Sequence, residues 1–297
     1  MRAKLVAALK AALRHGVGGE ADVERFIDGS LPFSVRGGYG GNTACVEIRG
    51  GDDIILCDAG TGLRDLGNHI MRSGGGGPAV YQIFLSHLHW DHIQGFPFFA
   101  PAFIPGNRIN FYGFHPELET AFRNQQNPPS FPVPLDYMKA EKSFTVLEPG
   151  REYRIGGLTV KGMKQNHPGD SYGYSFEKEG RKIVYSTDSE HKGDVRGAER
   201  SVLDFFRAAD LLIFDAQYSF IESAYTKESW GYSSNILGVE LAVAAGVARL
   251  CLFHNEPACD DDALDLFLEN TRNYLQIHSS TSSLQIDLAY DGLEIAI

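Results

Sequence analysis

The chain has 297 residues, of which 43% are hydrophobic and 22% are charged, as in an ordinary globular protein with a large core. Its formal net charge is -11 at pH 7. An acidic chain offers no broad basic surface to a nucleic-acid backbone, so a long nucleic acid is not expected as a partner. A small phosphorylated substrate stays compatible with this charge, because bound metal ions add positive charge of their own.

The first residues, MRAKLVAALKAALRH, predict an amphipathic helix rather than a signal peptide. Leu5, Leu9 and Leu13 lie one helical turn apart, and Lys4 and Lys10 interrupt the apolar run. We expect this helix either to pack on the domain or to contact another subunit, as in a homodimer. No segment is apolar enough to span a membrane, and the four cysteines form no CxxC pair. The sequence therefore predicts a soluble, cytoplasmic protein.

Short apolar runs rich in β-branched residues predict strands through most of the chain. These runs are ACVEIRG, DIILCDAG, AVYQIFLSH, RINFYGF, LTVKGMKQNH, YGYSFEKEGRKIVYSTD, LLIFDAQ, RLCLFHN and LQIDLAYDGLEIAI. Glycine-containing turns at 178–181 and 291–292 predict hairpins within two of them. Helical periodicity follows over 202–209, 236–247 and 263–274. Strands with helices packed outside them predict an α/β (α+β) protein with four αββα layers.

The segment 95–142 differs from its surroundings, because it is dense in proline and aromatic residues (FPFFAPAFIPG and NPPSFPVPLDYM). Such a composition predicts an irregular insert. It would form either a flap over whatever the preceding loop binds or a loop that only covers the sheet.

Metal-binding residue types recur where the predicted strands end. The stretch HLHWDH places three histidines and an aspartate within six positions. Four further strand ends carry the same residue types, namely His167, Asp188, Asp215 and His254. The ends of neighbouring strands converge at one edge of a sheet, so these side chains are expected to meet.

A lone histidine at a strand end is more often a satisfied turn residue than a ligand. Three imidazoles and a carboxylate buried together, however, would be left unpaired without a cation. Five histidines and two aspartates exceed what one ion needs, which favours two ions of Zn, Mn or Fe with a bridging carboxylate. Two other histidines, His115 and His191, stay candidates for facing a substrate.

These residues make the chain resemble the metallo-β-lactamase superfamily from about Phe33 to the C-terminus. HLHWDH matches the superfamily's HxHxDH signature, and NTACVEIRGGDDIILCDAGTGLRDLG resembles its opening hairpin, with Asp58 near the site. The resemblance implies a metallo-β-lactamase-like domain over 31–297, with the insert at about 95–142, after a helical extension over 1–30. It also implies the ligands of two metal ions: His87, His89 and His167 for one, Asp91, His92 and His254 for the other, and Asp188 as the bridge.

Within the superfamily, an aspartate rather than a cysteine at position 188 resembles the phosphoester hydrolases. GGYGGNTACVEI, FPVPLDYM and FDAQYS are similar to bacterial proteins close to RNase Z and the cyclic-nucleotide phosphodiesterases. RNase Z carries a long arm for tRNA between the third histidine and the bridging aspartate, whereas a plain hairpin is predicted here. Relatives often read GWGHS where this chain reads SWGYSSN, so Tyr232 replaces a histidine that assists protonation of the leaving group. A phenol, with a pKa of about 10, is a weaker general acid.

The predicted function is a dinuclear metal-dependent phosphodiesterase for a small substrate such as a cyclic nucleotide or short oligonucleotide. Two divalent ions, zinc first, would polarise the phosphoryl oxygens. Asp91 would accept or relay a proton, Asp215 would orient its neighbours, and Tyr232 would donate a hydrogen bond. The alternatives are a hydrolase of a thioester, lactone or β-lactam, a di-iron redox protein, and a binding module that only retains metal.

Overall fold

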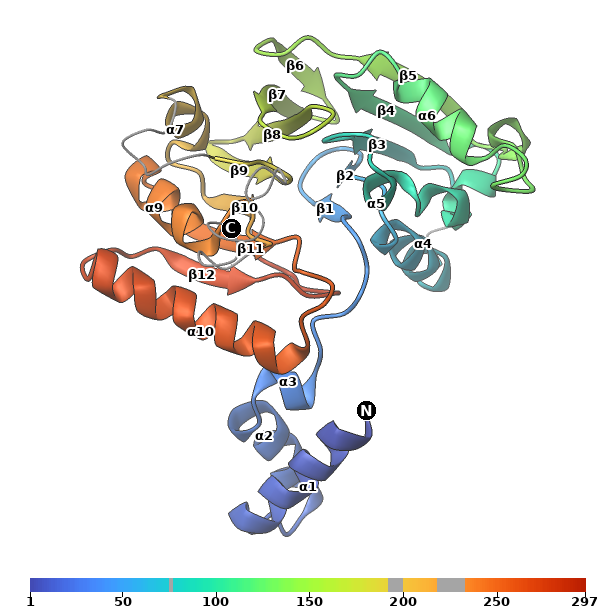
Figure 1. The fold of residues 1–297 in the computed structure, drawn as a ribbon. Helices are drawn as coiled ribbons and strands as arrows, with labels where there is room; N and C mark the ends of the chain where they lie inside the picture. Colours follow the sequence, from blue (N-terminus) through green and yellow to red (C-terminus); the bar gives the residue numbers. More distant parts are fainter. Residues whose placement is uncertain (75–76, 192–199, 218–232) are drawn as a thin grey trace.

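The computed structural model describes residues 1–74, 77–191, 200–217 and 233–297. In that part of the chain the strands form two sheets, one of five strands and one of seven, and helices cover the outer side of each. The predicted four-layer αββα arrangement is thus confirmed (Figure 1). None of the described helices is long and apolar enough to cross a membrane.

The first sheet has the strand order β1-β2-β3-β4-β5. Its strands are β1 Val46–Ile48, β2 Ile54–Cys57, β3 Val80–Phe84, β4 Arg108–Gly113 and β5 Glu141–Val146. The first pair is antiparallel, and the other three pairs are parallel. The parallel strands β2 and β3 are largely buried, which is why their sequences read as nearly continuous apolar runs.

The second sheet has the order β12-β11-β10-β9-β8-β7-β6. Its strands are β6 Glu152–Ile155, β7 Leu158–Gln165, β8 Ser171–Lys178, β9 Arg181–Ser186, β10 Leu211–Asp215, β11 Arg249–Phe253 and β12 Gln285–Leu288. Strands β6 to β9 run antiparallel, and β9 to β12 run parallel. Strand β10 is buried at every position, as expected for a central parallel strand.

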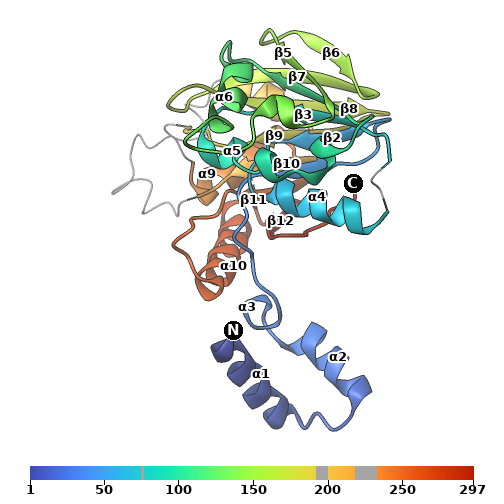
Figure 2. The ribbon, with the colours of Figure 1, turned by 90° about the vertical axis from the view of Figure 1, so that its right-hand side faces the viewer.

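The helices divide between the two outer faces and an N-terminal projection (Figures 1 and 2). Those on the first sheet are α4 Gly62–Arg72, α5 Trp90–Ile93 and α6 Leu118–Gln125, with the 3-10 turns η1 Phe96–Phe98, η2 Ala100–Phe103 and η3 Leu135–Tyr137. Those on the second are α7 Arg200–Phe206, α9 Asn235–Ala245 and α10 Asp261–His278. The N-terminal helices are α1 Arg2–His15, α2 Glu20–Ser30 and α3 Phe33–Arg36.

Aromatic side chains hold the two sheets face to face. Phe84 of the first sheet stacks on Tyr112 at 4.9 Å between ring centroids. Across the sandwich it meets the edges of Tyr174 at 5.4 Å and Phe176 at 5.1 Å. All three rings of this cross-sheet contact are buried. The ends of β3 and of the second sheet are therefore fixed against each other, and the polar residues that follow them lie at the same edge.

Each run predicted as a strand contains at least one strand, and the predicted hairpin at 178–181 is confirmed by the pairing of Lys178 with Arg181. The hairpin predicted at 291–292 is wrong, because only β12 forms in the run 284–297. Gly292 does form a turn, with a φ of 89°. Beyond it Leu293 and Ile295 pack against the core between the sheets, which partly buries them without strand pairing.

The prediction that 95–142 is irregular is only partly right. Strand β4 lies inside this segment and pairs on both sides within the first sheet. Helix α6 also lies inside it, where Phe122 contacts Phe96 and Phe111 at ring distances of 5.4 and 4.5 Å. The aromatic residues of the segment thus build the outer core of the first sheet.

Candidate metal centre

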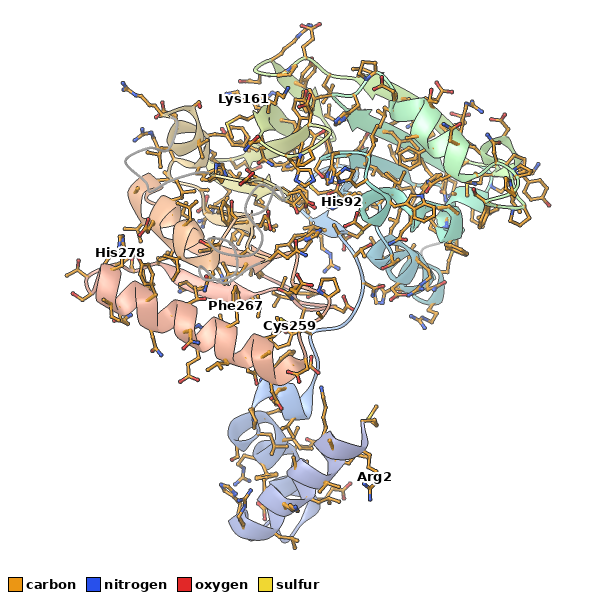
Figure 3. The ribbon with its side chains drawn as sticks, viewed as in Figure 1. Arg2, His92, Lys161, Cys259, Phe267 and His278 are labelled. Atoms are coloured by element: carbon orange, nitrogen blue, oxygen red, sulfur yellow. The ribbon has the colours of Figure 1, made fainter. Side chains whose placement is uncertain are left out.

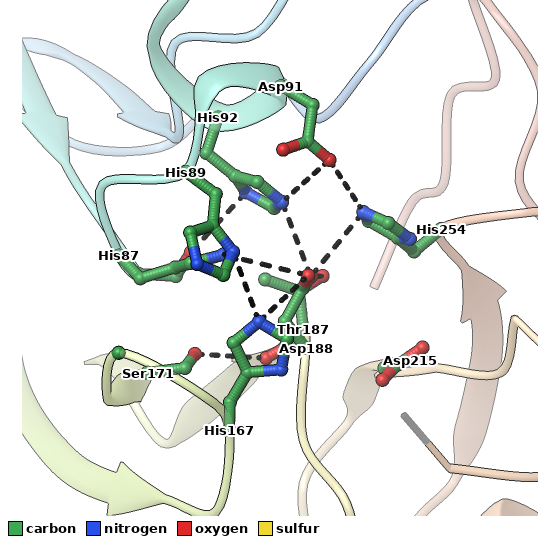
Figure 4. Close-up of polar contacts among 12 residues, drawn as sticks. His87, His89, Asp91, His92, His167, Ser171, Thr187, Asp188, Asp215 and His254 are labelled. Carbon is green, nitrogen blue, oxygen red and sulfur yellow. Dashed lines mark hydrogen bonds and ion pairs between the residues drawn. The ribbon is translucent and has the colours of Figure 1, made fainter. Parts of the chain in front are cut away.

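The predicted ligands meet at one edge of the sandwich (Figure 4). His87 to His92 follow β3 and enter the short helix α5, while the others follow strands of the second sheet. His167 comes after β7, Asp188 after β9 and His254 after β11. Loops from both sheets therefore contribute to one cluster, as expected from the strand ends.

The first group contains the imidazoles of His87, His89 and His167. Nε2 of His87 lies 3.0 Å from Nδ1 of His89, and Nε2 of His167 lies 3.2 Å from the same Nδ1. Two of these side chains are buried, whereas His89 is exposed and marks the open side of the group. Three ring nitrogens that converge on one point form a donor set suited to a divalent transition metal.

The second group contains Asp91, His92 and His254. Oδ2 of Asp91 lies 3.5 Å from Nε2 of His92 and 3.3 Å from Nε2 of His254. The two imidazole rings are nearly parallel, 5.4 Å apart between centroids. The Asp91 side chain is 38% exposed, so this group also opens to solvent on one side.

The carboxylate of Asp188 lies between the groups and presents one oxygen to each. Its Oδ2 lies 3.7 Å from Nε2 of His87 and 3.9 Å from Nε2 of His167. Its Oδ1 lies 3.4 Å from Nε2 of His92 and 3.5 Å from Nε2 of His254. This is the geometry of a bridging carboxylate.

Two buried atoms of the cluster have no hydrogen-bond partner within the described part of the chain: Nε2 of His92 and Oδ2 of Asp188. Both side chains are almost fully buried. A buried polar atom without a partner is costly, and a cation between the ligands would satisfy both atoms. The residues therefore fit two metal ions.

Buried hydrogen bonds behind the ligands determine which ring nitrogens face the cluster. Asp58 accepts at Oδ2 from Nδ1 of His92 at 2.8 Å, from the Ser86 hydroxyl at 2.7 Å and from Tyr185 at 2.6 Å. Because the Ser86 proton goes to Asp58, its oxygen accepts from Nδ1 of His87 at 3.0 Å. Both histidines are then left with an Nε2 lone pair turned toward the cluster, as metal ligands require.

Three residues of the centre adopt left-handed backbone conformations. Asp58 has a φ of 60°, Asp188 a φ of 47° and His254 a φ of 62°. Such values are uncommon outside glycine, and strained residues concentrate at functional sites. At the ends of β9 and β11 they direct Asp188 and His254 into the cluster, and at the end of β2 they direct Asp58 to the hydrogen bonds behind it.

The pKa shifts at the cluster arise from the mutual attraction of carboxylates and imidazoles. Burial acts to raise the pKa of Asp188, but His92 and His254 outweigh it and hold the pKa well below its usual range. Burial acts to lower the pKa of His92, yet Asp188 and Asp58 raise it well above its usual range. The negative charge thus attracts a proton to the place that a cation would take.

Asp215 lies behind the cluster rather than among its ligands. It accepts backbone N–H bonds from Ser189 at 3.0 Å, Gln217 at 3.2 Å and Ser233 at 3.4 Å. Burial and the charge of Asp188 raise its pKa. Its contacts tie together the loops after β9 and β10. Tyr232, predicted as a hydrogen-bond donor, lies outside the described residues.

Neither of the two candidate substrate-facing histidines belongs to a ligand group. Nε2 of His115 donates to the backbone carbonyl of Asp170 at 2.9 Å, in the loop that follows His167. His191 is stacked on Phe214 at 5.8 Å, and burial lowers its pKa to about 4. The first histidine anchors a ligand loop, and the second is a packing residue.

Sequence reasoning missed Tyr185 and Ser86, and it did not single out Trp90. Trp90 stands between the two ligands His89 and Asp91 and is 70% exposed. A large aromatic side chain at that place on the open side of the centre can contact a substrate. The signal in the sequence was the place of Trp90 between two candidate ligands, whereas its exposure, unusual for a tryptophan, is seen only in the structure.

The family model of the β-lactamase superfamily domain matches residues 54–255, more than half of the chain. Ribonuclease Z of Thermoplasma acidophilum is 25% identical over 298 aligned positions, which cover 84% of this chain and 89% of that protein. Ribonuclease Z of Thermoplasma volcanium is 28% identical, with coverage of 78% and 86%.

Solved structures share the fold at lower identity. The metallo-β-lactamase fold protein YhfI of Bacillus subtilis has a TM-score of 0.63 at 20% identity, covering 84% of this chain and 90% of that one. The short form of human tRNase Z has a TM-score of 0.58 at 20% identity, covering 86% of this chain and 92% of that one. A diphosphatase of the PhnP family has a TM-score of 0.58 at 18% identity, covering 86% of this chain and 84% of that one. The family match, together with the relatives and the candidate ligand set, shows that the chain belongs to the metallo-β-lactamase superfamily and is a metal-dependent hydrolase that is similar to ribonuclease Z.

Proposed function

We propose that this protein is a dinuclear metal-dependent phosphodiesterase that hydrolyses a small phosphodiester, such as a cyclic nucleotide or a short oligonucleotide. The observation that carries the proposal is the placement of the Asp188 oxygens, one toward each ligand group, at distances between 3.4 and 3.9 Å. In this proposal His87, His89 and His167 hold one ion, and Asp91, His92 and His254 hold the other.

Bound divalent ions, of which zinc fits the nitrogen-rich ligands best, would supply Lewis acidity and an activated water. The chain's own residues hold and orient the reacting groups. Asp91 is both a ligand and the partly exposed carboxylate of the centre, so it is placed to accept and relay a proton. Neighbouring imidazoles overcome the effect of burial and keep its pKa below the usual range, so the carboxylate is ionised.

Asp215 acts as a positioning residue in this proposal, because it holds the backbone of Ser189 next to the bridging carboxylate. It also accepts from the backbone of Ser233, which directly follows Tyr232. The Tyr232 hydroxyl is proposed to donate a hydrogen bond to the leaving-group oxygen. Its high intrinsic pKa makes it a weak acid, and this favours substrates with good leaving groups.

Two features support a small substrate over a long nucleic acid. Strands β8 and β9, which lie between His167 and Asp188, are joined directly by a tight turn at 178–181. No additional domain or arm is inserted between these two ligands. The formal charge of -11 gives little electrostatic attraction for a polyanion. The ribonuclease Z relatives make precursor tRNA the competing substrate that the experiment has to include.

The test is hydrolysis of bis-p-nitrophenyl phosphate, cyclic nucleotides, short oligonucleotides and precursor tRNA by protein reconstituted with zinc or manganese. Asp188→Ala is expected to abolish turnover, whereas Asp170→Asn, which removes the charge of an exposed carboxylate three residues after His167 and tolerates the left-handed φ of 61° there, should retain it. Metal content is measured beside activity. Two bound ions without turnover of any phosphodiester would contradict the proposal and favour a thioester, lactone or β-lactam as substrate. Preference for precursor tRNA would contradict the small-substrate part alone.

A further inference from the structure

Trp90 stands next to the metal centre and is 70% exposed, more than any other large aromatic side chain among the described residues. Its neighbours in the sequence belong to different ligand groups, since His89 lies in the first group and Asp91 in the second. Consecutive Cα atoms lie about 3.8 Å apart, so the backbone of Trp90 is within one residue of both groups. Its side chain therefore starts at the rim of both candidate metal sites.

The solvent-facing part of this loop is short. Between Ser86 and Phe99, only His89, Trp90 and Phe98 are exposed. Because His89 is itself a candidate ligand, the face of the loop that meets solvent at this point is also the open side of the first ligand group. The indole of Trp90 therefore borders the opening through which a substrate would reach the metal ions.

The exposed aromatic rings of the described chain differ in what covers them. Phe98 contacts Phe131 edge to face, with 5.5 Å between ring centroids. The ammonium group of Lys139 lies 5.4 Å from the ring centroid of Tyr137. Among the described residues, no aromatic ring and no cation lies against the ring of Trp90. This indole keeps a large apolar face in water, which a planar ligand would cover.

The surroundings of His89 leave room for such a ligand. A Cβ on Gly169 would lie 3.5 Å from Nε2 of His89, so this glycine lies beside the imidazole without a side chain that would narrow the opening. Figure 3 shows His92, two residues after Trp90, where the two sheets meet, and Arg2 of helix α1 in a different part of the molecule. The N-terminal helices therefore do not cover this part of the metal centre.

The chemistry of a single open ring selects the class of ligand. Recognition of a quaternary ammonium group typically uses a cage of several aromatic rings, whereas Trp90 offers one. A nucleobase stacks on one aromatic face, and the stack needs no charge on the protein, which suits a chain with a net charge of -11. In a nucleotide the base is one sugar away from the phosphate, within reach of a residue that adjoins the metal ligands.

We propose that Trp90 is a specificity-determining residue that stacks on the nucleobase next to the reacting phosphate, so that the substrate is a nucleotide rather than a base-free phosphodiester. This inference rests on the proposed function, because it takes the phosphodiester to bind at the metal centre. The metal ions would hold the charged phosphate, and the indole would hold the uncharged base. Loss of one such stack weakens binding by about 5- to 150-fold, equivalent to about 1–3 kcal/mol.

The first experiment compares a dinucleotide with its abasic counterpart as substrates of the zinc-reconstituted protein. Trp90→Leu, which keeps an apolar side chain without a ring, is expected to raise KM for the dinucleotide at least fivefold and to leave KM for the abasic substrate unchanged. Trp90→Phe keeps a smaller ring and should lie between. Tyr137→Leu is the matched control with wild-type KM values, because Tyr137 is 60% exposed and its ring is already covered by Lys139. Circular dichroism and zinc content check that each variant is folded and loaded.

A binding measurement tests the stack without turnover. Adenosine monophosphate is titrated into the zinc-reconstituted protein while tryptophan fluorescence is recorded, with ribose phosphate as the base-free control. Adenosine monophosphate is expected to quench the wild type with saturation and Trp90→Leu much less, and ribose phosphate should quench neither. The other tryptophan of the chain, Trp230, is present in both proteins, so the difference between them reports on Trp90.

Two results would overturn the proposal. Equal losses on the dinucleotide and on its abasic counterpart in Trp90→Leu would show that Trp90 only shapes the metal centre. Quenching that is absent, or equal in the wild type and Trp90→Leu, would mean that no base stacks on this ring. Quenching that requires Trp90, without hydrolysis of any phosphodiester, would instead refute the proposed function and support the stack. Phosphodiester hydrolysis together with either of the first two results would refute the stack alone.

Discussion

Replacing Asp58 with asparagine should weaken metal binding without removing a ligand. The carboxylate accepts four hydrogen bonds: from the Ser86 backbone N–H and hydroxyl, from His92 and from Tyr185, at distances between 2.6 and 2.8 Å. Asparagine has the same shape and tolerates the left-handed φ of 60° at this position. The substitution therefore changes the hydrogen bonding and the charge while it keeps the backbone conformation.

The magnitude follows from the donors that lose a partner. An amide has one accepting oxygen, so if it faces His92, its NH2 group must face the Ser86 backbone N–H. One buried donor is then left unpaired, which costs about 1–3 kcal/mol of folding free energy. His92 also loses the negative charge that strengthens its Nε2 as a ligand. Removal of such a partner typically weakens metal affinity by about 10–100-fold.

The assay is a competition titration with a chromophoric zinc chelator, beside metal content and thermal unfolding. Tyr185→Phe removes one hydrogen bond to Asp58 but keeps its charge, so it should cost about 1 kcal/mol of stability and little affinity. Tyr174→Phe is the matched control, because the hydroxyl of Tyr174 is equally buried and donates to the Leu85 carbonyl at 2.7 Å. Two zinc ions bound by Asp58→Asn at wild-type affinity would refute the reasoning.

Further outcomes follow from other contacts. Gly60→Ala should lower the free energy of unfolding by about 1–3 kcal/mol and weaken zinc binding, because the new Cβ would lie 2.4 Å from the Asp91 carbonyl oxygen. Gly29→Ala is the control, because its Cβ would meet nothing within 4 Å. Equal melting temperatures of the two variants would contradict this prediction. Chelation of the metal should lower the melting temperature by several degrees and added zinc should restore it, with a smaller effect in Asp188→Asn. Burial lowers the pKa of His191 to about 4 in the folded protein, whereas an unfolded histidine has a pKa of about 6.5. As the pH falls from about 6.5 to 4, the unfolded chain binds a proton at His191 that the folded protein does not bind, so the free energy of unfolding declines by up to roughly 3 kcal/mol. His191→Gln should flatten this decline in urea titrations at several pH values, and an unchanged slope would count against burial as the cause.

The convergence of the candidate ligands could be predicted from the sequence because their signal is local. Four of them occupy His87 to His92, and the others directly follow apolar runs, where strand ends bring them together. The hydrogen bonds behind them had no such signal. Tyr185 reaches Asp58 across 127 residues of chain, and the contact depends on how the two sheets face each other. A tyrosine in an alternating strand reads as core from its sequence alone.

Helix α4 was not predicted, because it too depends on tertiary packing that the local sequence does not reveal. Its sequence, GLRDLGNHIMR, includes two glycines, which weaken the local preference for a helix. The structure explains Gly67, because a Cβ there would lie 2.8 Å from the Phe99 ring. Close packing of the helix on the aromatic segment thus overrides the cost in propensity. Strand β5 was missed because it is mostly exposed and its sequence, EKSFTV, is largely polar.

The cost of the metal centre explains why it lies between two sheets. Left-handed conformations at Asp58, Asp188 and His254 each cost on the order of 1–3 kcal/mol, and two buried ligand atoms lack partners among the described residues. Loops alone would relax out of such an arrangement. Each strained residue instead follows a buried strand, and Phe84 holds the first sheet against the aromatic rings of the second. The packed sheets therefore hold the strained residues in place, and the binding energy of the ions can stabilise the native state.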